Sequence, residues 1–206
     1  MADALCIFKP DAAHRPAVRA AAAAWLLSED GWKVHGLTWF QAPRALVEQH
    51  YDFLQGRPFF PWLVDFMSAL PVVVGRVEAD APVLERMRYD LGETRIPESR
   101  PGSLRERFGI GGGVNIIHLS DAPDTGAKEV ALWAPHVDLD RRDAELPTTS
   151  TAPDHTFHLR SLALQYGGGI HRDLAQAAIE QLLRQESDLD GERFPTLTRI
   201  ILEAFD

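Results

Sequence analysis

Four short segments built mainly from apolar side chains predict β-strands. Ala4–Phe8 is a continuous apolar run that ends at Lys9-Pro10-Asp11, as expected of a buried strand followed by a loop. Trp32–Gln41 partly alternates between apolar and polar residues, Pro71–Val77 is rich in β-branched residues, and Val114–His118 is a final short apolar run. The side chains of the second segment that we expect to face inward are Trp32, Val34, Leu37 and Trp39.

Five further segments have the residue spacing of helices. Pro16 begins an alanine-rich helix that we expect to run to about Glu29, with Gly31 as its stop. The other four predicted helices are Pro43–Tyr51, Pro61–Leu70, Ala81–Asp90 and Pro123–Leu132. The resulting order of strands and helices favours an α+β fold, a ferredoxin-like α/β sandwich with a four-stranded antiparallel sheet.

The character of the chain changes after Trp133. Ala134–Asp154 contains prolines and many acidic or hydroxyl residues, which is typical of a linker or a surface strap. Three more helices are predicted beyond it, at His155–Gln165, His171–Gln185 and Pro195–Phe205. We therefore expect a domain at 1–135, a linker or strap at 136–154 and a helical C-terminal extension at 155–206.

Gly92–Gly113 lacks a periodic pattern and predicts a long loop, and long loops in compact domains are commonly functional. Arginines gather in this loop and just before it, at Arg86, Arg88, Arg95, Arg100, Arg105 and Arg107. Guanidinium groups held close together repel one another unless an anion lies between them, so the loop indicates either a phosphate site or a solvated basic segment. Because Asn115, His118 and Ser120-Asp121 follow it, a histidine that handles phosphate gains support over a structural one.

Two other motifs near these segments do not indicate sites. Gly109–Gly113 resembles part of a dinucleotide-binding turn, but it precedes a strand instead of opening a helix. Glu186–Gly191 resembles the start of a calcium loop, yet Leu197 stands where such a loop needs a bidentate acid. We expect a helix-terminating turn at the second motif.

Charge and cysteine content limit the class of protein. The chain has 206 residues and a net charge of −9, which argues against broad binding to nucleic acid but leaves room for a local basic pocket. Cys6 is the single cysteine, so no internal disulfide can form and a reducing compartment is expected. The sequence contains no stretch long enough to span a membrane and no signal pattern at its start. These features predict a cytoplasmic protein.

Several segments, read together and in order, resemble the nucleoside diphosphate kinase family. They are Lys9-Pro10-Asp11, His50-Tyr51, Arg57-Pro58-Phe59-Phe60, Leu91-Gly92-Glu93-Thr94, Ser99-Arg100-Pro101-Gly102-Ser103-Leu104-Arg105, Asn115-Ile116-Ile117-His118, Ser120-Asp121 and Lys128-Glu129. The resemblance covers about the first two-thirds of the chain. It implies transfer of the γ-phosphate of a nucleoside triphosphate to a nucleoside diphosphate, by a ping-pong mechanism through a phosphohistidine.

The resemblance also implies roles for particular residues. His118 would be the nucleophile, Glu129 would orient its ring, and Ser120 would bridge that carboxylate and the phosphate. The implied nucleotide-binding residues are Lys9, Tyr51, Phe59, Arg88, Thr94, Arg105 and Asn115. Mg²⁺ would be held mainly by the nucleotide phosphates, and Asp121 would reach it through water.

The resemblance implies that different residues of this set contact the phosphate, the ribose and the base of a nucleotide. Arg88, Arg105, Thr94 and Tyr51 would surround the transferring phosphate. Lys9 and Asn115 would hold the ribose hydroxyls and bridging oxygens. Phe59 would stack on the base, which tolerates any base because stacking barely discriminates among them.

Two departures from the family pattern affect the expected site. Leu119 stands where the family has a glycine after the histidine, and we expect it to crowd the floor of the site. Gly112 stands where an apolar side chain would face the base opposite Phe59, so the base clamp is expected to be open on one side. These departures leave two alternatives, a relative specialised for an unusual nucleotide and a nucleotide-binding regulatory or scaffolding protein.

The C-terminal extension has no counterpart in this resemblance. Its helices carry apolar residues at helical spacing, which are Leu174, Ala178 and Leu182 on one and Leu197, Ile200, Ile201 and Phe205 on another. Short helices are unstable alone, so they must pack on the preceding domain, on a neighbouring subunit or on another protein. Members of the family are oligomers, and we expect a homo-oligomer of altered order in which the extension serves assembly and packing.

Overall fold

The computed structural model describes residues 1–28 and 30–206. Its sheet has four strands, β1 (Ala2–Phe8), β2 (Lys33–Phe40), β3 (Val72–Ala79) and β4 (Ile117–Leu119). They lie in the order β2-β3-β1-β4, and each neighbouring pair is antiparallel. The predicted ferredoxin-like sandwich is therefore confirmed. Because β1 lies between β3 and β4, the residues that follow β1 come close to the polar residues around β4.

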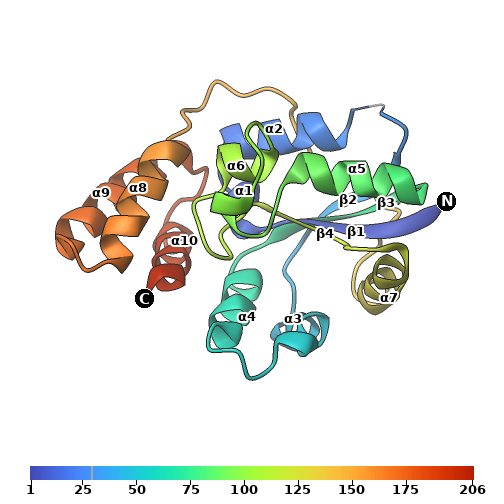
Figure 1. Ribbon diagram of the computed structural model, residues 1–206, viewed down its shortest axis with the longest axis horizontal. Helices are drawn as coiled ribbons and strands as arrows, with labels where there is room; N and C mark the ends of the chain where they lie inside the picture. Colours follow the sequence, from blue (N-terminus) through green and yellow to red (C-terminus); the bar gives the residue numbers. More distant parts are fainter. Residues whose placement is uncertain (29) are drawn as a thin grey trace.

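Helices cover both faces of the sheet (Figure 1). On one face lie α2 (Pro16–Leu26) and α5 (Ala81–Leu91), and on the other lie α3 (Arg44–His50), α4 (Phe60–Ser68) and α7 (Pro123–Trp133). Alternate residues of β1 enter the two resulting cores: Cys6 packs in the first, and Leu5 and Ile7 pack in the second. The alanine-rich helix ends earlier than predicted, at Leu26, and the expected end at Glu29 falls outside the described residues.

Short helices account for most of the differences from the predicted elements. The segment predicted as one long loop contains η2 (Ile96–Glu98) and α6 (Leu104–Phe108). The Ser103 hydroxyl caps α6 by accepting a hydrogen bond from the backbone N–H of Glu106. The other two are α1 (Pro10–Ala13), directly after β1, and η1 (Asp52–Leu54), directly after α3. Helices of three to five residues show no apolar periodicity, so the sequence pattern could not reveal them.

Trp39 lies on the predicted inward face of β2 but is not buried there. Trp32 and Leu37 are buried as expected, but Trp39 is 38% exposed. The pairing of β2 with β3 shifts between Val34 and Gly36, so the strand contains an irregularity at that point. The extra residue reverses the alternation of a regular strand, so Leu37 and Trp39 lie on the same face as Trp32 and Val34. Trp39 stays partly exposed at the end of β2, where its ring lies beside His14 and Arg19.

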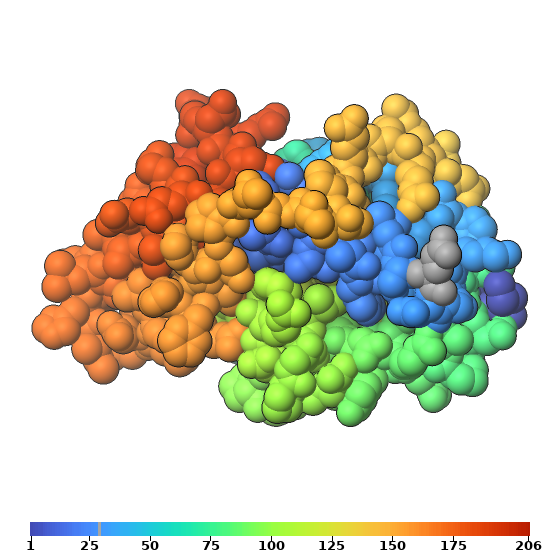
Figure 2. All heavy atoms as spheres, turned by 90° about the horizontal axis from the view of Figure 1, so that it is seen from above, coloured from blue at the N-terminus to red at the C-terminus, as the bar shows by residue number. Residues whose placement is uncertain are grey.

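The predicted strap, residues 136–154, crosses the edge of β2. The backbone N–H of Leu37 donates to the carbonyl of Arg141, and the N–H groups of Asp143 and Ala144 donate to the carbonyl of Leu37. A side chain at position 36 would collide with the carbonyl of Leu139, so the close approach requires Gly36. In Figure 2 this yellow-to-orange strap runs across the blue N-terminal segments toward the C-terminal helices.

The C-terminal extension consists of α8 (Thr156–Gly167), α9 (Arg172–Glu186), α10 (Arg193–Leu202) and η3 (Glu203–Phe205), and we call residues 155–206 the tail. The tail packs on the rest of the same chain, because Leu197, Ile200 and Ile201 share one hydrophobic core with residues of β1 and α4. The apolar face predicted for α9 is displaced by one residue from the face that is buried. Leu174 is 71% exposed, and the buried apolar residues are Ala175, Ile179 and Leu183.

Candidate active site

The side chains of His118, Glu129 and Ser120 form a hydrogen-bonded cluster at the end of β4. His118 Nε2 lies 2.9 Å from Glu129 Oε2, and the Ser120 hydroxyl donates to the same oxygen at 2.6 Å. The backbone N–H of Leu5, in the neighbouring strand, donates to Ser120 Oγ at 2.8 Å and fixes the hydroxyl. The cluster has the geometry of a nucleophilic histidine oriented by a carboxylate. Since Glu129 occupies Nε2, the ring nitrogen left for a substrate is Nδ1.

Glu129 is held in its ionised form. Burial alone would raise the pKa of Glu129, but the hydrogen bond and charge of His118, the charge of His50 and the hydroxyl of Ser120 lower it below the ordinary value. An ionised carboxylate accepts a hydrogen bond from the N–H at His118 Nε2. That arrangement leaves the lone pair on Nδ1, the nitrogen that is free to attack a substrate.

His50 is a site residue for which the sequence indicated no role. Its ring is buried and lies edge-on to the His118 ring, with 4.6 Å between the centroids. The indole N–H of Trp133 donates to His50 Nδ1 at 3.1 Å, so a neutral His50 carries its proton on Nε2. Burial, with the charge of His118, lowers the pKa of His50 to about 3, which keeps the ring neutral. Trp133 is 83 residues away in the sequence, so no local pattern could reveal this pair.

The same protonation bears on metal binding. Ligand atoms of His50, His118 and Glu129 lie within 4.8 Å of one another, a spacing that could hold a metal ion. A ring nitrogen that carries a proton cannot coordinate a metal, and His50 Nε2 carries one while Trp133 donates to Nδ1. We therefore assign the three side chains to histidine chemistry and not to a metal centre.

Lys9 and Asn115 form a second polar group next to the cluster. Lys9 Nζ donates to Asn115 Oδ1 at 2.6 Å and to the carbonyl of Gly113 at 3.2 Å, and Asn115 Nδ2 donates to the carbonyl of Thr94 at 2.9 Å. Burial, followed by the positive charge of Arg105, lowers the pKa of Lys9 to about 7, although Asp11 opposes the shift. A buried ammonium with so few compensating charges is suited to an anionic ligand.

Asp11 has a structural role that the sequence did not indicate. Its carboxylate Oδ2 accepts a hydrogen bond from the backbone N–H of Ile116 at 3.0 Å, while the backbone N–H of Lys9 donates to the carbonyl of Ile116 at 2.8 Å. Ile116 has φ of +70°, a conformation that is costly for a β-branched residue. The two bonds hold this strained residue between Asn115 and His118, and so fix the relative positions of both.

Only some of the arginines in the predicted cluster belong to the site. Arg105 is buried and donates to the carbonyls of Gly92 and Ile117, at 3.0 and 2.7 Å. Burial and the nearby Arg88 lower the pKa of Arg105 to about 10, and its Nε has no partner in the described part of the chain. Arg88 donates to the carbonyl of Leu119 at 2.8 Å and pairs with Asp121 at 2.6 Å.

The remaining loop arginines fit the alternative of a solvated basic segment. Arg95 pairs with Glu98 at 3.2 Å, and the Arg95 side chain is 80% exposed. Arg100 pairs with Asp90 at 2.7 Å and stacks over the Tyr89 ring. The predicted cluster therefore divides into Arg105, which is buried, with the half-buried Arg88 beside it, and arginines such as Arg95 and Arg100 in surface ion pairs.

The other residues that are expected to contact the nucleotide differ in how far they are buried. Tyr51 is buried with its ring centroid 6.1 Å from that of His118, and its hydroxyl has no hydrogen-bond partner among the described residues. Burial raises the pKa of Tyr51, so the hydroxyl remains a donor. Phe59 is 48% exposed at the start of α4, as a stacking platform requires. Thr94 is exposed, and its carbonyl accepts from Asn115.

The expected crowding by Leu119 does not occur. Leu119 is buried in the same core as Phe8 and Cys6, on the α2 and α5 side of the sheet. Its neighbour His118 packs against His50 and Tyr51, on the α3 side. Successive side chains of a strand point to opposite faces, so the leucine lies away from the reacting histidine.

The oxygen donors of the site fit a divalent ion that is carried mainly by phosphates. Asp121 is 73% exposed at its side chain and pairs with Arg88, and Glu129 is engaged with His118 and Ser120. A single exposed carboxylate cannot form a complete Mg²⁺ site, but it can bind a water of the ion. Asp121 is therefore a suitable indirect ligand.

Comparisons with known proteins identify the family of this site. A family model described as nucleoside diphosphate kinase matches residues 2–139. The nucleoside diphosphate kinase of Trichormus variabilis is 43% identical over 109 residues, which cover 53% of this chain and 72% of that protein. The enzyme of Chloroflexus aurantiacus is 36% identical over 137 residues, or 66% of this chain and 89% of that protein.

Solved structures agree with the sequence comparisons. The nucleoside diphosphate kinase of Aquifex aeolicus superposes with a TM-score of 0.58 at 31% identity, and the match covers 68% of this chain and 98% of that chain. The enzyme of Encephalitozoon cuniculi superposes with a TM-score of 0.57 at 27% identity, over 65% and 88% of the two chains. The family model ends at residue 139, before the tail begins. The chain belongs to the nucleoside diphosphate kinase family of phosphotransferases.

Proposed function

We propose that the protein transfers the γ-phosphate of a nucleoside triphosphate to a nucleoside diphosphate in two half-reactions that share a phosphohistidine on His118. The observation that carries the proposal is the bond from His118 Nε2 to Glu129, which leaves Nδ1 as the nucleophilic nitrogen. A binding protein does not need a nucleophile with an oriented ring. The arrangement therefore supports an enzyme over the alternative of a regulatory or scaffolding protein.

In the first half-reaction, the lone pair of His118 Nδ1 attacks the γ-phosphorus. The new N–P bond forms while the bond from the γ-phosphorus to its bridging oxygen breaks, and the nucleoside diphosphate leaves with that electron pair. His118 keeps its Nε2 proton, and the ionised Glu129 that accepts a hydrogen bond from it stabilises the positive ring that forms. In the second half-reaction, a terminal oxygen of another nucleoside diphosphate attacks the phosphorus and the N–P bond breaks. No net proton transfer is required.

Residues around the histidine provide positive charge and hydrogen-bond donors for the phosphate that is being transferred. Arg105 and Arg88 supply guanidinium groups, and the hydroxyl of Tyr51, which has no partner among the described residues, supplies a donor. In this proposal Ser120, which donates to Glu129, contacts the phosphate as well. Positioning and charge stabilisation account for most of the rate in phosphoryl transfer, so fixed donors of this kind suit the reaction.

For the rest of the nucleotide we propose contacts in keeping with the geometry. Lys9 and Asn115 bind the ribose hydroxyls and the bridging oxygens, Thr94 lies beside the phosphates, and Phe59 stacks on the base. Asp121 would bind a water of a Mg²⁺ ion that the nucleotide phosphates carry. When bound, this ion neutralises phosphate charge.

We further propose a cytoplasmic location and a homo-oligomeric state. The free thiol of Cys6 is buried, and burial raises its pKa to about 12, so it persists unreacted in a reducing compartment. None of the described helices has the length and apolar character needed to cross a membrane. Light scattering of the full chain measures the number of subunits, and a single mass equal to one chain would refute an oligomer.

The test of the function is labelling with ATP that carries ³²P at the γ-position. We expect the protein to retain label that is stable in base, labile in acid and removed by an unlabelled nucleoside diphosphate. His118→Ala should not label, whereas His136→Ala, which alters an exposed histidine after α7, should label normally. Label on the His118→Ala protein would refute the assignment. Binding of nucleotide without any label on the unmodified protein would favour the regulatory alternative.

Substrate preference distinguishes the remaining alternative. With Phe59 alone stacking on the base, the four common diphosphates should remove the label at similar rates. A large preference for one base would instead favour a relative specialised for an unusual nucleotide.

A further inference from the structure

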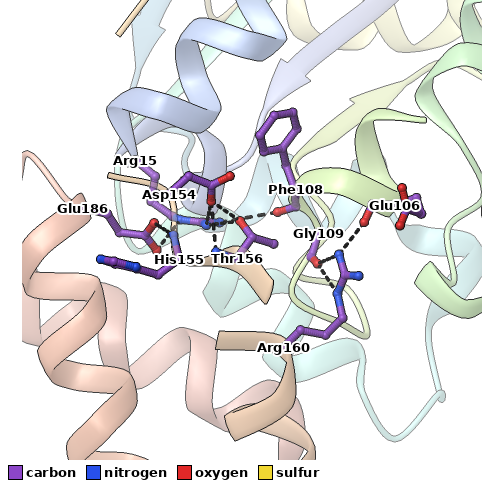
Figure 3. A network of polar contacts seen from close by, with 9 residues as sticks. All are labelled: Arg15, Glu106, Phe108, Gly109, Asp154, His155, Thr156, Arg160 and Glu186. Atoms are coloured by element: carbon purple, nitrogen blue, oxygen red, sulfur yellow. Dashed lines mark hydrogen bonds and ion pairs between the residues drawn. The ribbon is translucent and has the colours of Figure 1, made fainter. Parts of the chain in front are cut away.

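An arginine of the tail is bound to the end of the helix that carries Arg105. Arg160 lies on α8, and its guanidinium donates to the carbonyl of Gly109 from Nε at 3.0 Å and from Nη2 at 2.7 Å. The same Nη2 donates to the carbonyl of Glu106. The last carbonyls of a helix have no partner within the helix, so Arg160 satisfies groups at the end of α6 that would otherwise need water. Figure 3 shows this contact from close by.

A second arginine joins the same helix end to the tail from the other side. Arg15 is fully buried between β1 and α2, and its Nε pairs with Glu186 at 3.0 Å. Its Nη2 donates to the hydroxyl of Thr156, and its Nη1 lies 3.5 Å from the carbonyl of Phe108 (Figure 3). A buried cation that is paired and hydrogen-bonded on all sides fixes the elements that it joins. The tail is thus attached to the end of α6 at two points.

The loop that follows α6 is also held by the tail. The Phe205 ring lies against Gly111, and the indole N–H of Trp62, whose ring lies against Gly113, donates to the carbonyl of Ile200 at 2.8 Å. The carbonyl of Gly113 in turn accepts from Lys9. The tail therefore contacts the segment between Arg105 and Asn115 directly at Glu106, Gly109 and Gly111.

Helix α6 is anchored in the core by Leu104 and Phe108 and capped by Ser103, and Arg160 fixes the carbonyls at its C-terminal end. It is five residues long, and a helix of one to two turns is not stable by itself. Its second residue, Arg105, extends to the carbonyls of Gly92 and Ile117 and presents an unpartnered Nε among the described residues. A small rotation of α6 would displace this guanidinium from the phosphate.

We propose that Arg160 is a positioning residue for phosphoryl transfer, which acts on the transferring phosphate by holding α6 and, through it, Arg105. Through Arg160, the tail then positions a residue of the nucleotide site, in addition to packing on the rest of the chain. This inference rests on the proposed function, because Arg105 must contact the phosphate for its position to matter.

The test is a double-mutant cycle between Arg160→Ala and Arg105→Ala, measured as kcat/KM and as the rate of phosphoenzyme formation from ATP. We expect Arg160→Ala to lower both quantities by between about tenfold and a hundredfold, as misplacement of a catalytic group by about 1 Å does. In the Arg105→Ala background the same change should lower them by less than about threefold, because the group being positioned is gone. Arg193→Ala removes a positive charge from an exposed position of the tail and should leave both quantities unchanged.

Each outcome separates this inference from a general loss of stability and from failure of the proposed function. Rates are compared at a temperature where circular dichroism shows every variant folded. If Arg160→Ala does not fold, Arg160→Lys, which keeps one donor for the carbonyls, replaces it in the cycle. Equal losses with and without Arg105, or no loss at all, would overturn the inference while the unmodified protein still labels. If the unmodified protein does not label with ATP, the proposed function itself fails.

Discussion

His118 Nε2 and Glu129 Oε2 lie 2.9 Å apart, across the gap between β4 and α7. This one contact decides which ring nitrogen can react, because a neutral imidazole has one lone pair and one N–H. With the N–H directed at the carboxylate, the lone pair on Nδ1 is directed away from α7. The chemistry of the site therefore depends on the position of α7, the helix that follows β4 in the sequence.

Glu129→Gln should slow phosphoenzyme formation by on the order of a hundredfold, because a neutral amide does not stabilise the positive ring of the transition state. Rapid-quench labelling with ATP measures this rate. The matched control is Glu192→Gln, at the exposed start of α10. A rate equal to that of the unmodified protein would mean that the carboxylate only packs against His118.

Trp133→Phe should lower the free energy of unfolding by roughly 1–3 kcal/mol, because it leaves the buried His50 Nδ1 without its donor. Urea unfolding followed by circular dichroism measures the change. Trp39→Phe is the control. Trp39 is 38% exposed, so its replacement should lower the free energy of unfolding much less. Equal losses for the two tryptophans would show that ring volume, and not the hydrogen bond, sets the cost.

Nucleotide binding should be accompanied by proton uptake at about pH 8 and by little uptake at about pH 6. The pKa of Lys9 is lowered to about 7, so most of the free protein has a neutral Lys9 at the higher pH. An anionic polyphosphate favours the ammonium and raises that pKa, which draws a proton from solution. At the lower pH the group is already charged, and the uptake disappears.

Calorimetry of ADP binding in two buffers with different ionisation enthalpies measures the number of protons. Lys9→Met should abolish the difference between the buffers, and Lys33→Met, at the exposed start of β2, should preserve it. Proton uptake that survives Lys9→Met would assign it to another group.

Gly112→Val should destabilise the protein by about 1–2 kcal/mol, because Gly112 has φ of +54°, a left-handed conformation that β-branched residues avoid. The surrounding space is open, so the cost arises from the backbone and not from a clash. Thermal unfolding measures it, and Gly112→Asn should be better tolerated. A valine added to close the base clamp therefore carries a cost that the sequence did not reveal. Unchanged unfolding with valine would contradict the assigned conformation.

The sheet could be predicted because its strands are continuous apolar runs. Ala4–Phe8 and Pro71–Val77 lie within two residues of β1 and β3. The irregularity in β2 could not be predicted, since the sequence around Gly36 gives no sign that a carbonyl of the strap lies against it. The buried face of α9 was displaced for a similar reason, because Leu174 and Ala175 are equally compatible with a helix and only the packing partner selects between them.

The candidate site was predictable where chemistry lies in side chains near the histidine. Ser120 and Glu129 follow His118 closely, and the structure places both in contact. The contributions of His50, Trp133 and Asp11 depend on pairs separated by up to 105 residues and on one strained backbone angle. Such pairs are determined by the tertiary fold and leave no local pattern.

The burial of Arg15 has a consequence for how the protein is made. Arg15 and its partner Glu186 are separated by 171 residues. At about 5–20 residues per second, a ribosome needs roughly 10 to 30 seconds to synthesise that interval. During this time an emerging chain cannot close around Arg15 without burying an uncompensated charge. We therefore expect the N-terminal segment to stay open at this point until Glu186 has been synthesised, and the site to become active only after that.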